Sequence, residues 1–197
     1  MEKKSEKQRS EYPYTFCYCE ENIWKLEQIR LGEDPTRKET DHIVFISNES
    51  KKVPVWTAKG EYVVWDYHVI LVEKRNQDAT VYDFDATTLP FPCPFQNYAA
   101  VCFRPQVALK DEFKRMFRVL KGEEFLRTFS SDRSHMIDPK TKTWMATPPA
   151  WPCIQLPGIK SNLFEEFIDM KRTTHGKVLK ESAFLSFFGY RAGKAET

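Results

Sequence analysis

Two neighbouring β-type segments constrain the fold of this chain more than any other feature of its sequence. In the first, 62–73, alternation places Asp66 and His68 on one face and an apolar series from Val63 to Leu71 on the other. In the second, 80–85, it places Asp83 and Asp85 on one face. A short polar connection joins the two segments, so they predict an antiparallel hairpin whose apolar face packs on a core.

The register of this hairpin decides which acidic residue meets the histidine. A turn centred between Arg75 and Asn76 places His68 opposite Asp83, with Cβ atoms roughly 4.5 to 5.5 Å apart. A shift of the centre by one residue brings Asp85 opposite His68 instead, and periodicity alone does not exclude that register. We favour the first register, in which Asp83 can fix the tautomer of His68 and stabilise its imidazolium form.

The remaining patterns predict a mixed α/β domain. We expect short strands at 42–47 and 53–56 and helices at 19–29, 113–120, 125–129 and 162–170, the fourth opened by a capping box at Asn162 and Glu165. A last helix should end at Phe188, before Gly189. The proline-rich stretches 89–95 and 147–157 should be rigid loops.

The length of 197 residues fits one domain. We therefore expect a single catalytic domain over 12–190, between a flexible charged tail, 1–11, and a C-terminal tail, 191–197.

Charge and composition exclude several classes of partner. The net charge is +2, and the first ten residues, with four basic and two acidic side chains, account for all of it. A neutral body disfavours binding to nucleic acid. Because no apolar run is long enough for a signal peptide or a membrane span, we expect a soluble intracellular protein without a membrane partner. Five irregularly spaced cysteines indicate reduced thiols.

Cys19 is the candidate nucleophile. It stands at the start of the predicted helix 19–29, where the helix dipole lowers the pKa of a thiol and free N–H groups can hold an oxyanion. With His68 as base and Asp83 as its orienting group, the sequence predicts a catalytic triad. The ordinary alternative is a half-buried strand histidine with two turn carboxylates, which the residues alone leave open.

Other polar motifs predict less chemistry. Cys17 and Cys19 lack a second cysteine or histidine pair at zinc spacing, so we expect no metal. No glycine-rich phosphate loop is present, and we expect no cofactor. The cluster 130–135 could line a substrate pocket or cap a helix, and we favour the structural role.

The segments 65–69 (Trp-Asp-Tyr-His-Val) and 17–24 (Cys-Tyr-Cys-Glu-Glu-Asn-Ile-Trp) resemble the protein N-terminal glutamine amidohydrolases, the WDYHV-motif family. Further similar blocks are 44–48, 82–85, 89–93, 131–136 and 152–153. The resemblance implies an α-β-α sandwich with a mainly antiparallel sheet and an active site similar to those of papain-like enzymes and transglutaminases. It places the triad on Cys19, His68 and Asp83, consistent with the favoured register.

The same resemblance implies the reaction: hydrolysis of the side-chain amide of an N-terminal glutamine to glutamate and ammonia through a thioester, preparing proteins for the Arg/N-degron pathway. The expected partners are proteins or peptides with a free N-terminal glutamine. The expected enzyme is a monomer of the cytoplasm, with the nucleus as a second location. Selectivity for the terminal residue needs a group that binds the α-ammonium, for which Glu20, Asp66 and Asp85 are candidates.

Two alternatives remain open at this stage. The first is another papain-like or transglutaminase-like cysteine hydrolase or acyltransferase. The second is a non-catalytic module that binds N-degrons.

Overall fold

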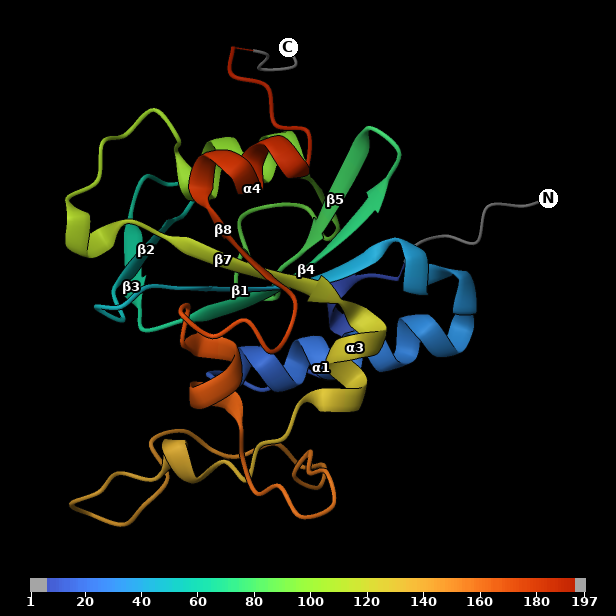
Figure 1. Cartoon of the computed structure of the whole chain (residues 1–197), viewed down its shortest axis with the longest axis vertical. Helices are drawn as coiled ribbons and strands as arrows, with labels where there is room; N and C mark the ends of the chain where they lie inside the picture. Colours follow the sequence, from blue (N-terminus) through green and yellow to red (C-terminus); the bar gives the residue numbers. More distant parts are fainter. Residues whose placement is uncertain (1–6, 194–197) are drawn as a thin grey trace.

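A six-stranded sheet forms the centre of the computed structural model, which describes residues 7–193 (Figure 1). Its strand order is β6-β5-β4-β1-β7-β8, and each neighbouring pair is antiparallel. The strands are β1 (Asp41–Ser47), β4 (His68–Arg75), β5 (Asp78–Tyr82), β6 (Cys93–Pro94), β7 (Met116–Lys121) and β8 (Lys177–Lys180). A separate two-stranded sheet pairs β2 (Val53–Trp56) with β3 (Tyr62–Trp65).

Helices cover both faces of the six-stranded sheet (Figure 1). One face carries α1 (Cys19–Glu33), α3 (Gly122–Thr128) and the π-helix Leu163–Ile168. The other carries α2 (Phe95–Tyr98), the π-helix Ala99–Phe103 and α4 (Glu181–Phe187). The expected α/β class and sandwich architecture are thus confirmed.

Each face of the sheet buries its own apolar cluster, for example Val69 and Leu71 on the α1 side and Ile70 and Val72 on the α4 side. Each fully buried side chain of this kind contributes about 1.5–3 kcal/mol. The hairpin was expected to bury only one face.

The expected single strand over 62–73 is wrong, because the chain turns at Asp66 and Tyr67. Asp66 Oδ1 accepts a hydrogen bond from the Tyr67 N–H, and its carbonyl accepts one from Ser47 Oγ. An aspartate that bonds its own backbone competes with the strand ladder. The first half of the segment therefore joins β2 in the small sheet, and only the second half, β4, enters the central one.

The expected helix over 113–120 is also wrong, since this segment contains strand β7. Phe117 and Val119 pack toward α4, while Leu120 packs in the cluster on the α1 side. A short apolar run that is buried on both sides has no strict alternation and imitates a helical spacing.

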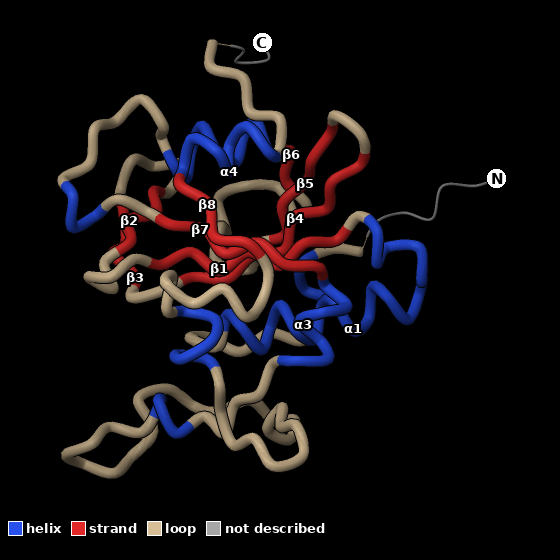
Figure 2. The backbone as a smooth tube through the Cα atoms, in the orientation of Figure 1, coloured by secondary structure: helices blue, strands red, loops and turns tan. Residues whose placement is uncertain are grey.

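The other predicted helices are present with shifted ends. Helix α1 extends four residues beyond the predicted end at Ile29. Helix α3 begins three residues before the predicted range 125–129 and ends one residue before its end, and α4 ends one residue before the predicted end at Phe188. The segment 162–170 contains a π-helix, and Asn162 makes no capping bond to it. Its side chain instead bonds Ser130 N and Thr128 O, so the predicted capping box is wrong. The stretch 147–157 is a loop, as Figure 2 shows in tan.

The N-terminal segment contacts the domain from Lys7 onward, while residues 1–6 of the expected tail and 194–197 of the C-terminal one lie outside the described residues. Arg9 Nη2 donates to the carbonyl of Ala86 at 2.9 Å and to those of Asp83 and Leu89 at 3.4 and 3.3 Å. The guanidinium of Arg9 therefore binds the backbone of the loop that follows β5. Within 7–193, no helix combines the length and apolar character that crossing a membrane requires.

Glu27 of α1 makes the stability of the fold depend on pH. Burial, and then the negative charge of Asp41, raise its pKa from 4.5 to about 8. The folded state therefore holds a proton that the unfolded chain releases, and stability falls as pH rises from about 4.5 to 8. We expect Glu27→Gln to stabilise the protein at pH 8 by on the order of 2 kcal/mol, with little gain at pH 4.5.

Denaturant unfolding at both pH values measures this difference. The exposed Glu61→Gln is the matched control and should change neither curve. Equal effects of Glu27→Gln at the two pH values would contradict the assignment.

Candidate active site

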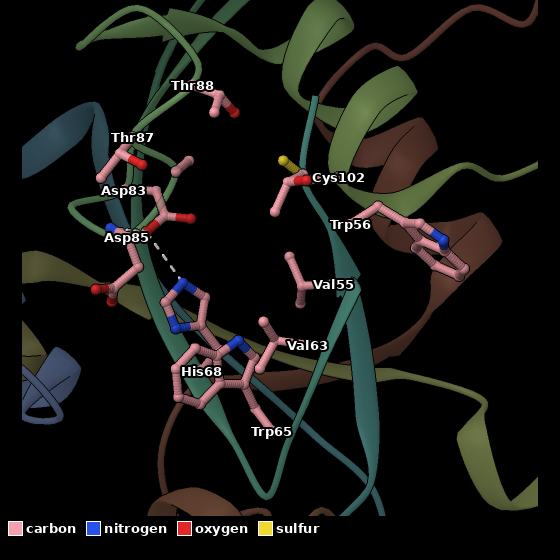
Figure 3. A pocket seen from close by; sticks show the side chains of 12 residues that line it. Val55, Trp56, Val63, Trp65, His68, Asp83, Asp85, Thr87, Thr88 and Cys102 are labelled. Atoms are coloured by element: carbon pink, nitrogen blue, oxygen red, sulfur yellow. Dashed lines mark hydrogen bonds and ion pairs between the residues drawn. The ribbon is translucent and has the colours of Figure 1, made fainter. Parts of the chain in front are cut away.

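His68 and Asp83 form a buried pair at the end of the central sheet (Figure 3). His68 Nε2 lies 3.0 Å from Asp83 Oδ1, and the two residues are 2% and 5% exposed. Asp83 Oδ2 accepts a 2.6 Å hydrogen bond from the Tyr98 hydroxyl, and Oδ1 accepts one from the Asp85 N–H. The carboxylate is thus oriented by three groups, and with Nε2–H donating to it, Nδ1 of His68 is left as the basic nitrogen.

The opposite charges of His68 and Asp83 stabilise each other and oppose the effect of burial on both pKa values. Burial lowers the pKa of His68, but the charge and hydrogen bond of Asp83 outweigh it, and the pKa lies above its ordinary value. Burial raises the pKa of Asp83, and His68 with Tyr98 reverses that effect, so the pKa lies below its ordinary value. His68 is therefore suited to hold a proton transiently during a reaction.

The predicted pair is present, but the predicted register is wrong. Leu71 pairs with Tyr82 and Arg75 with Asp78, so the turn is centred one residue later than expected. Continued past its last pair, this register would place Asp85 opposite His68. Strand β5 ends at Tyr82, however, and the chain leaves the ladder at Asp83, whose side chain turns to the imidazole.

A small cavity lies on one side of His68. Its volume is about 60 Å³, and Val55, Val63 and Cys102 line the wall away from the imidazole (Figure 3). Trp65 stacks on the His68 ring with a centroid distance of 5.8 Å and an interplanar angle of 18°. A cavity of this size holds a few water molecules, not a glutamine side chain.

His68, Asp83 and Asp85 also offer three ligand atoms within 4.8 Å of one another. Their oxygen atoms already accept hydrogen bonds, Asp83 from His68 and Tyr98 and Asp85 from Tyr14 at 2.8 Å. Hydrogen bonds from protein groups therefore already engage both carboxylates.

Cys19 is the first residue of α1, as the sequence predicted. The N-cap residue, Tyr18, gives the helix no side-chain cap, and in the first turn the backbone N–H of Glu20 bonds the carboxylate of Glu20 itself. Among the described residues, the sulfur has polar contacts with Glu20 Oε2, at 3.7 Å, and with the backbone N–H of Val69, and it makes no hydrogen bond to the His68 ring. Val69 follows His68, so the sulfur lies beside the start of β4.

The predicted lowering of the pKa of Cys19 is wrong. Burial raises the pKa well above its ordinary value, and the negative charges of Glu20 and Asp85 raise it further. The hydrogen bond from Val69 opposes these effects without cancelling them. The resting group is a thiol, so its attack on a substrate requires a base to take the proton as the new bond forms.

The three candidate carboxylates lie near Cys17, two residues before Cys19. The charges of Glu20, Asp66 and Asp85 all act on the neighbouring Cys17. Glu20 is fully buried, Asp85 is half-buried and Asp66 is exposed. The surroundings of Cys17 and Cys19 are therefore acidic, which favours a cationic ligand.

Several supporting residues were not predicted. Arg133, from the polar cluster 130–135, donates to both carboxylate oxygens of Glu21 at 2.7 Å, and Trp151 Nε1 donates to Glu21 Oε2. The same cluster brings His135 within 3.7 Å of Glu20. The density of polar residues in 130–135 was the available signal, but sequence spacing does not show which helix such a loop reaches.

Tyr98→Phe tests the support of the pair. Loss of the donor to Asp83 Oδ2 should raise the pKa of Asp83 and weaken its hold on His68, because that bond favours the ionised carboxylate. We expect catalytic turnover of the substrate to fall about tenfold, measured as kcat with KM nearly unchanged. Tyr62→Phe, at an exposed tyrosine, is the control, and an equal loss in both variants would contradict this role.

Comparison with known proteins identifies the family of the chain. A model of the N-terminal glutamine amidase family matches residues 14–188. The chain is 43% identical to a protein N-terminal glutamine amidohydrolase of Danio rerio over 184 residues, 90% of each protein. It is 40% identical to the human protein of that name over 182 residues, which cover 89% of this chain and 87% of its relative. The chain therefore belongs to the N-terminal glutamine amidase family.

Proposed function

We propose that this protein hydrolyses the side-chain amide of an N-terminal glutamine to give N-terminal glutamate and ammonia. The match to N-terminal glutamine amidohydrolases over most of the chain carries the proposal. The matched range contains Cys19 and the buried His68–Asp83 pair. These are the residue types that an amide hydrolysis through a thioester requires.

In the proposed mechanism, the sulfur of Cys19 attacks the side-chain carbonyl carbon while His68 takes the thiol proton. The N-terminal N–H groups of α1 hold the oxyanion. The C–N bond then breaks as His68 returns the proton to nitrogen, so ammonia leaves and a thioester remains. His68 next removes a proton from water, which attacks the thioester, and the proton goes back to the sulfur as glutamate is released. Asp83 orients His68 throughout.

Recognition of the free N-terminus is assigned to the three carboxylates near Cys17 and Cys19. A bound α-ammonium would be attracted by Glu20, Asp66 and Asp85 together, and the exposed Asp66 and half-buried Asp85 are the members that a peptide can reach from solvent. An acetylated N-terminus has no positive charge. We therefore propose that the enzyme acts only on peptides with an unblocked first residue.

The product of the proposed reaction has glutamate at its N-terminus. We therefore propose that the enzyme acts before arginylation in the Arg/N-degron pathway. We place it in the cytoplasm, and also in the nucleus, as a monomer that needs no cofactor. These assignments follow from the family resemblance.

Mass spectrometry of three peptides tests the function. A peptide that begins with glutamine should gain about one dalton as its amide becomes an acid through the thioester route. The same sequence beginning with asparagine or acetyl-glutamine should stay unchanged. Cleaved peptides would indicate a protease, amine-linked peptides would indicate a transglutaminase, and binding without turnover would indicate a recognition module. Each of these results would contradict the proposal.

A further inference from the structure

Glu20 is a fully buried carboxylate that touches the nucleophile. Its Oε2 accepts a 3.0 Å hydrogen bond from the Tyr67 hydroxyl and lies 3.7 Å from Cys19 Sγ. Its Oε1 is buried and has no hydrogen-bond partner among the described residues. A buried carboxylate oxygen without a donor is costly and calls for an explanation.

His135 faces the same unpartnered oxygen. Its Nε2 lies 3.7 Å from Glu20 Oε1, beyond hydrogen-bonding distance, and both ring nitrogens are buried without partners in the described chain. Burial lowers the pKa of His135, so its ring is neutral at pH 7 and does not neutralise Glu20. A carboxylate and a neutral imidazole that both lack partners indicate a place for a hydrogen-bond donor from a ligand.

The position of the sulfur identifies that donor. In a reactive complex the attacked carbon lies about 3 to 3.5 Å from the sulfur. The amide nitrogen is only about 1.33 Å from that carbon, whereas the α-nitrogen is four bonds away. The N–H group of the substrate nearest to Glu20 is therefore that of the side-chain amide, not that of the α-ammonium.

We propose that Glu20 distinguishes the glutamine amide of the substrate from the glutamate carboxylate of the product. Oε1 accepts a hydrogen bond from the amide NH₂ and turns the carbonyl carbon toward Cys19. After hydrolysis a second carboxylate stands where the NH₂ was, and its repulsion by Glu20 expels the product. The inference rests on the proposed function and adds a specificity residue to it.

The ionisation of Glu20 should make this discrimination depend on pH. Burial raises its pKa to about 7, opposed first by the hydrogen bond from its own backbone N–H and then by those from Tyr67 and Cys19, while the charge of Glu21 adds to the increase. Protonated Glu20 can donate to a product carboxylate, and ionised Glu20 repels it. The preference for the amide should therefore grow as pH rises through about 7.

Binding to an inactive enzyme measures the preference directly. In the Cys19→Ala background, Kd is measured by calorimetry at pH 8 for two peptides that differ only in beginning with glutamine or glutamate. We expect the glutamine peptide to bind at least about tenfold more tightly. Adding Glu20→Gln should reduce the ratio to about two, mainly through tighter binding of the glutamate peptide, because an amide can also donate.

Asp66→Asn in the same background is the matched control. It removes one negative charge from the same group of three carboxylates, so it should weaken the binding of both peptides alike and leave the ratio unchanged. A ratio of ten or more that survives Glu20→Gln overturns the inference. If the Cys19→Ala protein binds neither peptide, the proposed function fails instead, so the two failures are distinguishable.

A second measurement does not depend on how the Glu20 variant folds. In Cys19→Ala with His68→Asn and His135→Asn, which remove the histidine paired with Asp83 and the histidine that faces Glu20, the binding ratio should rise severalfold between pH 6 and pH 8.5. The side chain of the glutamate peptide is ionised throughout this range. A ratio that does not change with pH also overturns the inference.

Discussion

Replacing Cys19 with alanine is expected to reduce ammonia release from a glutamine-initiated peptide by on the order of 10⁵-fold or more, because the variant lacks the sulfur that forms the proposed thioester. The measurement is ammonia release with enzyme in excess over substrate, so that a slow residual rate is visible. The fold should persist, since the change removes one small side chain at the start of a fifteen-residue helix.

Cys17→Ala is the matched control for this prediction. Cys17 lies two residues earlier, near the same carboxylates, and has a left-handed backbone (φ 68°) that alanine tolerates no worse than cysteine does. Its activity should remain within about threefold of the original. Substantial activity in Cys19→Ala, or an equal loss in the two variants, would identify a different nucleophile.

Asp83→Asn is expected to reduce kcat by about 10³- to 10⁴-fold, the effect of losing the carboxylate that fixes the tautomer of a catalytic histidine. An asparagine NH₂ facing Nε2 favours the proton on Nδ1, where the base is needed. The charge of Asp83 also raises the pKa of His68, so the acidic limb of the kcat/KM profile should move to lower pH in the variant.

Asp85→Asn separates the two aspartates of the Tyr-Asp-x-Asp motif. Asp85 bonds Tyr14 and acts on the thiol by its charge, whereas Asp83 bonds the imidazole. The Asp85 variant should raise KM more than it lowers kcat. A larger loss of kcat in Asp85→Asn than in Asp83→Asn would show that the wrong aspartate has been assigned.

The sequence predicts the sheet and the His68–Asp83 pair, but not how the backbone brings the two residues together. The alternation of apolar and polar residues in 62–73 continues through the turn at Asp66, because the residues on both sides of the turn all favour strands. The pattern therefore does not show that a strand ends there. The turn of the hairpin is centred one residue later than predicted. His68 still meets Asp83 only because Asp83 lies beyond the end of strand β5. Resemblance to the family selected Asp83 where periodicity left Asp85 open.

Tertiary packing determines the features that the sequence pattern does not predict. Residues 116–121 are buried on both sides, which hides the period of a strand. Helix position alone predicts an acidic thiol at Cys19, but burial and the charges of Glu20 and Asp85 raise its pKa. The approach of His135 to Glu20 joins residues 115 positions apart, and no local pattern encodes such a contact.

Rapid acid quenching followed by mass spectrometry of the digested enzyme tests the central claim most directly. During turnover of a glutamine-initiated peptide, the fragment that contains Cys19 should carry the mass of the peptide less ammonia, and hydroxylamine should remove it. The adduct should be absent from Cys19→Ala and from trials with acetyl-glutamine peptide. Full turnover with no adduct on Cys19 at any quench time, together with an adduct on another residue, would contradict the account.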